Sequence, residues 1–131
     1  MIKPPDAESR AFAIFVADAL SEKKGSDVTI LEVGPIVGYT EYFVVCNGRS
    51  DRLVKALADH VCRHSREQLK RHTLSTEGTE RGQWALLDFG DIVVHIFRDQ
   101  ERVFYDLDGL WEDAPRVPYE PPPPPVAATG T

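Results

Sequence analysis

The chain has 131 residues, of which 42% are hydrophobic and 27% are charged, so one ordinary domain with its own core is expected and no metal or disulfide is needed to stabilise it. The formal net charge of -6 argues against a protein that wraps nucleic acid through bulk positive charge, whereas it suits a basic protein partner. With no apolar run long enough to span a bilayer, no signal-peptide pattern at the N-terminus and only two cysteines, the sequence predicts a cytoplasmic protein that makes no contact with a membrane.

The first half of the chain alternates between helical and strand patterns. Its helical segments place apolar residues three and four positions apart, and its strand segments are rich in β-branched residues. Ser50 or Asp51 can cap the second helix, because a side-chain oxygen there can accept a backbone N–H of the first turn. The predicted elements are, in chain order, a helix over residues 6–24, strands over 28–33 and 40–46, and a helix over 50–71.

The second half begins with a polar, glycine-containing segment, residues 73–83, which predicts a loop. Asp88-Phe89-Gly90-Asp91 then separates two apolar runs, which is a hairpin signal. The predicted elements are strands over residues 84–87, 92–97 and 103–105 and a terminal helical turn at 107–111. From Ala114 the sequence becomes rich in proline, so we expect residues 114–131 to form a disordered tail outside a folded domain of residues 1–113.

Helices and strands in this order predict an α/β fold, in which helices pack on a mixed β-sheet. The apolar run of residues 40–46 fits a strand that is covered on both faces. The passage from this strand through the helix over 50–71 to the strand over 84–87 is predicted to be a right-handed crossover.

The hairpin is the most informative segment, because both of its faces are apolar. An even-length turn over residues 88–91 pairs Leu87 with Ile92 and Trp84 with His95. One face then carries Ala85, Leu87, Ile92, Val94 and Ile96, and the other carries Trp84, Leu86, Val93, His95 and Phe97. Either helices cover both faces, or the face that bears Trp84 and His95 is partly uncovered and meets a partner, since tryptophan is enriched among interface anchors.

One pattern admits an enzyme as the alternative function. The segment Gly48–Asp51 opens a helix directly after a strand and could present backbone amides to a phosphate. With Asp88 and Asp91 as metal ligands, it sketches a nucleotidyltransferase that acts on a nucleotide or nucleic acid. However, no lysine-bearing phosphate loop accompanies the aspartates, so a capped helix and a solvated turn are the expected structures.

The histidines and cysteines give little support to a metal site. His60 and His64 share a helical face and could ligate zinc, but no Cys-x-x-Cys pair accompanies them, and we expect a surface pair. Cys46 and Cys62 are expected to be small core residues and not nucleophiles. The sequence therefore predicts no metal, no cofactor and no catalytic residues.

Six segments, taken together and in order, resemble the Iojap family of ribosomal silencing factors, RsfS. The segments are Asp27–Val33, Thr40–Ser50, Ala58–Val61, Glu77–Gly78, Trp84–Phe97 and Arg102–Trp111. The likeness covers about residues 7–113, and the block Trp84–Phe97 is its most specific part. The sequence departs from the family where Glu41 replaces a common aspartate and where residues 34–38 are rich in glycine and proline.

The resemblance implies a binding protein and not an enzyme. Members of the family bind the large ribosomal subunit through its protein fourteen and block joining of the small subunit, which represses translation when nutrients are limited. The implied fold resembles a nucleotidyltransferase core that lacks the catalytic residues. Sequence-specific binding of nucleic acid is not expected, and an isologous homodimer of the free protein through an apolar sheet face stays open.

The resemblance also implies where a partner binds. The characteristic sheet residues of the family map to one set in this chain, and acidic groups beside them suit a basic ribosomal protein. The expected partner-binding residues are Trp84, His95, Phe97, Asp88, Asp91, Glu77 and Tyr105.

Overall fold

The computed structural model describes residues 7–105, 112 and 114–122 and contains a five-stranded sheet with the order β1-β2-β5-β4-β3. The strands are β1 (Ser26–Glu32), β2 (Tyr42–Gly48), β3 (Ser75–Glu77), β4 (Trp84–Asp88) and β5 (Ile92–Arg98). The helices are α1 (Ala7–Glu22), α2 (Gly34–Val37), α3 (Asp51–Leu69) and α4 (Asp99–Tyr105). Among the described residues, β2 and β5 pair in parallel and the other strand pairs are antiparallel, so the prediction of an α/β fold with a mixed sheet is confirmed.

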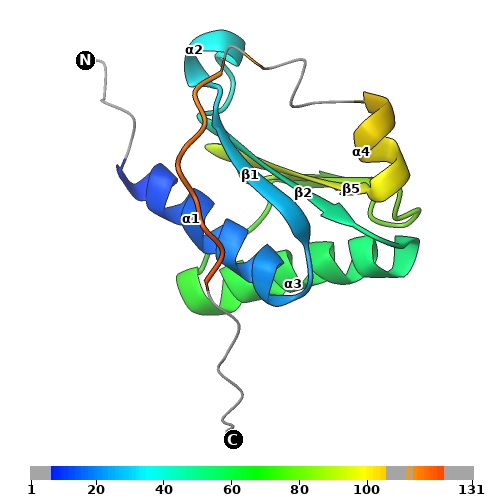
Figure 1. Ribbon diagram of the computed structural model, residues 1–131. Helices are drawn as coiled ribbons and strands as arrows, with labels where there is room; N and C mark the ends of the chain where they lie inside the picture. The colour runs from blue at the N-terminus through cyan, green and yellow to red at the C-terminus, as the bar shows by residue number, and fades with distance from the viewer. Residues whose placement is uncertain (1–6, 106–111, 113, 123–131) are drawn as a thin grey trace, which may run out of the picture.

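Helices α1 and α3 lie beneath the sheet and α4 lies on its other side, as Figure 1 shows. Both long helices form because their apolar residues recur at helical spacing and face the sheet. Ser50 caps α3, since its Oγ accepts the backbone N–H of Leu53 at 3.1 Å, as the sequence predicts. The main core therefore lies between these two helices and the sheet.

The predicted crossover joins the wrong pair of strands. The strand that lies parallel to β2 is β5, whereas β4 is antiparallel to β5. The chain therefore returns from α3 through β3 and β4 before it reaches the parallel position. The sequence does not reveal this, because β3 is a three-residue strand of Ser75, Thr76 and Glu77 inside the segment predicted to be a loop.

The hairpin confirms the two predicted faces but not the predicted register. Trp84 pairs with Phe97 and Leu87 with Val94, which shifts the pairing by two residues. A shift of two leaves every side chain on its face, because the side-chain period of a strand is two. The turn is also tighter than predicted, since the N–H of Phe89 donates to the carbonyl of Ile92 at 2.9 Å. Gly90 makes this turn feasible with a φ of 94°, which glycine adopts at low cost.

The prediction of a strand at residues 103–105 is wrong, because these residues form the last part of helix α4. Asp99 and Glu101 lie in the first turn of α4, where negative charge is favourable. Glu101 also accepts hydrogen bonds from Arg98 at 2.8 and 3.0 Å, which fixes the start of this helix. The β-branched and aromatic residues at 103–105 favour a strand only weakly, and these contacts favour the helix. The terminal helical turn predicted at residues 107–111 lies outside the described residues.

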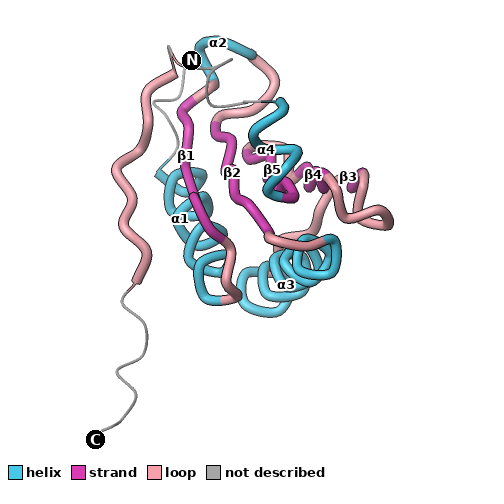
Figure 2. Tube along the Cα trace, turned by 45° about the vertical axis from the view of Figure 1, so that its right-hand side comes forward, coloured by secondary structure: helices cyan, strands magenta, loops and turns pink. Residues whose placement is uncertain are grey.

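The prediction that order ends at residue 113 is wrong for residues 114–122, which we call the C-terminal strap. Figures 1 and 2 show the strap beside β1 and α1. Arg116 forms an antiparallel bridge with Leu31, and Ala114 and Val117 are buried. The sequence hides this packing because the strap is short and proline-rich, and only a few of its side chains are apolar. Within the described part of the chain, no helix is long and apolar enough to cross a membrane.

Candidate functional site

Four side chains share the sheet face opposite α1 and α3, near the β3 edge. Trp84, Leu86 and Asp88 alternate along β4, so they point to the same face. Glu77 lies directly opposite Leu86 on β3 and therefore shares that face. Trp84, Leu86 and Asp88 are half-buried, whereas Glu77 is exposed. We call these four residues the Trp84 surface.

The indole of Trp84 is held by its neighbours on β5. Its ring stacks on Phe97 with centroids 4.8 Å apart, and its Nε1–H donates to Nδ1 of His95 at 3.2 Å. His95 in turn packs edge-on against Phe43 of β2 at 4.6 Å. The Trp84 side chain is therefore held in one orientation by His95 and Phe97, while part of it stays accessible to solvent.

His95 and Phe97 support the surface from within the core. The sequence predicts that both rings contact a partner. In the structure Phe97 is fully buried and His95 is 5% exposed, so neither ring is available to a partner. Burial lowers the pKa of His95 to about 4, which keeps the imidazole neutral near pH 7. Since Nδ1 accepts the indole N–H, the proton is assigned to Nε2, which has no hydrogen-bond partner among the described residues.

The other predicted contact residues divide between the two faces of the sheet. Asp88 accepts the N–H of Gly90 at 2.8 Å and so stabilises the turn beside the Trp84 surface. Asp91 instead accepts a hydrogen bond from Ser9 of α1 at 2.7 Å and forms an ion pair with Arg71, on the helical side. Asp91 is therefore separate from the Trp84 surface. Tyr105 is the last residue of α4, and its side chain is outside the described residues.

The residues of the predicted nucleotidyltransferase site do not come together. Asp51 pairs with Arg98 at 2.7 Å where β2 and β5 end, whereas Asp88 and Asp91 flank the start of β5. A seven-residue strand separates the two groups, which is about 20 Å at ~3.3 Å per residue. Ser50 is occupied as a helix cap. Among the described residues, no group of three or more histidine, cysteine, aspartate or glutamate side chains could hold a metal ion.

The histidine pair is packed into the helical layer. His60 and His64 stack with centroids 5.1 Å apart, and His64 also stacks on Phe15 of α1 at 4.9 Å. The predicted surface pair is thus a half-buried contact between α1 and α3. Cys46 is fully buried and burial raises the pKa of its thiol to about 12, whereas Cys62 is half-buried with its pKa raised for the same reason. Neither thiol has the character of a nucleophile.

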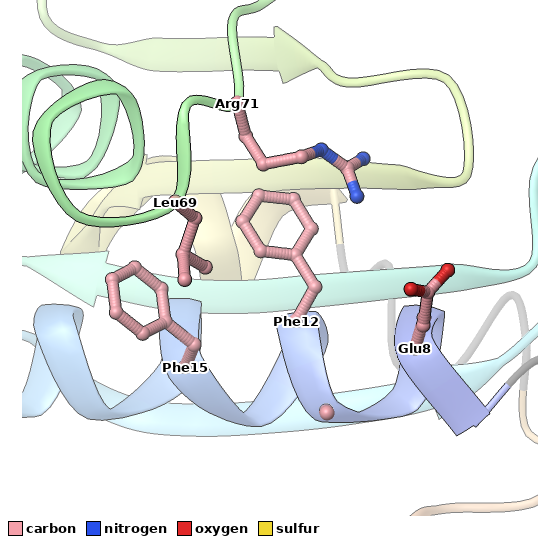
Figure 3. Close-up of a pocket in the computed structure, with 6 residues that line it drawn as sticks. Glu8, Phe12, Phe15, Leu69 and Arg71 are labelled. Atoms are coloured by element: carbon pink, nitrogen blue, oxygen red, sulfur yellow. The ribbon is translucent and has the colours of Figure 1, made fainter.

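A hollow of about 480 Å³ lies on the helical side and was not anticipated from the sequence. Figure 3 shows Phe12 and Phe15 of α1 facing Leu69 and Arg71 at the end of α3. The guanidinium of Arg71 lies 4.2 Å above the Phe12 ring while it pairs with Asp91. Because Phe12 and Phe15 belong to an ordinary helical stripe, their sequence pattern is the same as that of core residues.

These features define a small α/β protein that carries an aromatic and acidic surface on one sheet face. The sequence matches the family described as "Ribosomal silencing factor during starvation" over residues 6–130. It is 38% identical over 106 residues to the ribosomal silencing factor RsfS of Halalkalibacterium halodurans, covering 79% of this chain and 87% of that protein. It is also 35% identical over 109 residues to the chloroplastic protein Iojap of Zea mays, covering 83% of this chain and 47% of that protein.

The fold is shared with two solved structures. A crystal structure from Bacillus halodurans superposes with a TM-score of 0.71 at 32% sequence identity, covering 87% of this chain and the whole of that chain. A second one, from Chromobacterium violaceum, also has a TM-score of 0.71, at 31% identity and with 92% of each chain covered. The chain therefore belongs to the RsfS family of ribosomal silencing factors, as its resemblance to that family implies.

Proposed function

We propose that the protein binds the large ribosomal subunit at its protein fourteen and thereby blocks joining of the small subunit, repressing translation during nutrient limitation. The proposal is supported by membership of the RsfS family, whose relatives are named ribosomal silencing factors. The observation that carries it to a particular surface is the half-buried Trp84, fixed in place beside an exposed acidic residue.

The chemistry of the Trp84 surface fits a basic protein. Glu77 is exposed and Asp88 is half-buried on the same face, and the whole chain has a net charge of -6. Opposite charges across an interface raise the association rate and fix the orientation of the partner. A half-buried indole that loses its remaining water on binding is a typical source of affinity. The surface therefore combines an apolar anchor with an acidic rim.

The proposed mechanism is steric and breaks no covalent bond. A folded domain seated on the face of the large subunit that meets the small subunit would occupy the space needed for joining. The protein needs a rigid surface for this task, and the two-layer core of the sheet provides one. We also propose a cytoplasmic location, and a homodimer of the free protein through the Trp84 face that ribosome binding displaces.

Binding of the isolated ribosomal protein fourteen to four variants tests the proposed surface. Trp84→Ala is expected to weaken binding about thirtyfold or more, since an anchor residue commonly contributes 2 kcal/mol or more, and Glu77→Lys is expected to weaken it by charge reversal. The matched controls lie on α3: Leu69→Ala removes an exposed apolar side chain and Glu67→Lys reverses an exposed charge. Both controls are expected to bind as the parent chain does.

A thermal melt of each variant separates loss of binding from loss of folding. If Trp84→Ala and Glu77→Lys stay folded and bind as well as the parent chain, the Trp84 surface is not the contact. If the Leu69→Ala control alone loses binding, the partner instead contacts the helical side.

A further inference from the structure

The C-terminal strap completes one edge of the sheet. The N–H of Glu32 donates to the carbonyl of Pro115 at 2.8 Å, and the N–H of Val117 donates to the carbonyl of Ile30 at 2.9 Å. These bonds flank the antiparallel bridge between Leu31 and Arg116. The strap thus satisfies two backbone groups of β1 that point away from β2.

Two side chains of the strap anchor it against the main core and α1. Val117 is 6% exposed and joins the main core. The hydroxyl of Tyr119 donates to Oδ1 of Asp18 at 2.9 Å and lies 3.0 Å from Oγ of Ser21, so α1 holds the strap from the side. Burial raises the pKa of Tyr119 to about 12. The strap is therefore held by β1 through its backbone and by α1 through the Tyr119 side chain.

The strap itself is a poor template for a further strand. Pro118 lies two residues after Arg116, so its backbone points away from β1, on the side where proline has no N–H to donate to a further strand. Arg116, at the bridge, is exposed and charged, and charged residues on an outer strand oppose edge-to-edge pairing. The strap therefore covers β1 at Ile30–Glu32 and presents there an outer edge that carries a proline and a charged residue.

The opposite edge of the sheet, β3, is protected from pairing with another chain by its length and composition. Strand β3 has three residues, all exposed and polar. Very short polar edge strands resist pairing with other chains, so this edge needs no cover. Strand β1 is longer and contains the buried residues Ile30 and Leu31, so an uncovered β1 is the edge that would recruit another strand.

We propose that the C-terminal strap is a built-in edge strand, which packs against β1 and α1 and prevents β1 from pairing with β1 of a second copy of this chain. The proposal is independent of ribosome binding, because the Trp84 surface lies at the β3 side of the sheet. Displacing the strap would free the N–H of Glu32 and the carbonyl of Ile30 on the outer edge of β1, and two such edges would join antiparallel into one continuous sheet.

The test uses the full chain. Val117→Asp combined with Tyr119→Ala removes both anchors of the strap and is expected to strengthen self-association at least tenfold, measured by light scattering over a concentration series. Glu120→Ala, at an exposed strap position, is the control and should behave as the parent chain. Adding Glu32→Pro to the double variant should abolish the extra association, because it removes an outward N–H of β1 that the β1–β2 ladder does not use.

Hydrogen exchange of the parent chain gives a second readout that needs no substitution. The amides of Glu32 and Val117 are expected to be protected, and in the double variant the Glu32 amide should lose protection at low concentration and regain it as the chains associate. An association through the sheet face would be equal in all these chains and insensitive to Glu32→Pro. Unprotected Glu32 and Val117 amides in the parent chain, or a folded double variant that associates no more strongly than the parent, would overturn the proposal.

Discussion

At the scale of single residues, the Trp84–His95 contact links the surface to the core. The indole N–H has one acceptor, Nδ1 of a histidine that burial keeps neutral. Strand alternation places both residues on the same face, and the sequence predicts this correctly. It does not predict that Phe97 and not His95 lies directly opposite Trp84, because a two-residue shift of register leaves the alternation unchanged.

The buried His95 predicts a defined loss of stability in acid. Its pKa is about 4 in the folded state against 6.5 for an exposed histidine, so the unfolded chain binds the proton first as the pH falls. The contribution of His95 to the free energy of unfolding should be fully present above pH 6.5. It should fall by about 3 kcal/mol between pH 6.5 and 4. Burial also lowers the pKa of His60, which acts in the same direction.

The comparison of the parent chain with His95→Asn by urea denaturation isolates this contribution, because the carboxylates titrate in both chains. Asparagine can offer an acceptor near the position of Nδ1 but does not titrate. The difference in unfolding free energy between the two chains should shrink steadily below pH 6.5. A constant difference from pH 7.5 to pH 4.5 would show that the pKa of His95 is the same in the folded and unfolded states, which contradicts the lowered value.

At the scale of elements, agreement between sequence and structure follows the length of the pattern. Helix α3 was predictable because nineteen residues keep one apolar stripe and begin with a capping serine. Strand β3 was not, because its three polar residues form a strand only by pairing with β4. The position of Glu77 beside Leu86 depends on that pairing. The family resemblance thus supplied Glu77 as a candidate, while the geometry that places it on the Trp84 surface could not be derived from local sequence.

The strap gives a prediction that is opposite to the one drawn from its composition. Deleting residues 114–131 is expected to lower the free energy of unfolding by about 2 kcal/mol, because the fold would lose the burial of Val117 and two backbone hydrogen bonds to β1, less the entropy of ordering the strap. Urea denaturation of the full and shortened chains measures the difference. Equal unfolding free energies would mean that the strap contributes nothing to the stability of the domain.

At the scale of the whole molecule, the faces and edges of the sheet differ in what they contact. One face packs on α1 and α3, one edge is covered by the strap, and the other edge borders the Trp84 surface. The carboxylates that could suggest phosphoryl transfer lie at opposite ends of β5, and each of them has a structural partner. A rigid domain that acts by occupying a surface agrees with this organisation.

Sedimentation with purified ribosomal subunits tests whether the protein binds the large subunit and blocks subunit joining. The parent chain is mixed with large or small subunits and centrifuged through a sucrose gradient, beside folded Trp84→Ala and Leu69→Ala chains. We expect the parent chain and Leu69→Ala to migrate with the large subunit only, Trp84→Ala to stay at the top of the gradient, and the bound protein to prevent the two subunits from joining. Migration of the parent chain with the small subunit or with neither subunit, or joining that proceeds while the large subunit is saturated with the protein, would overturn the proposed function.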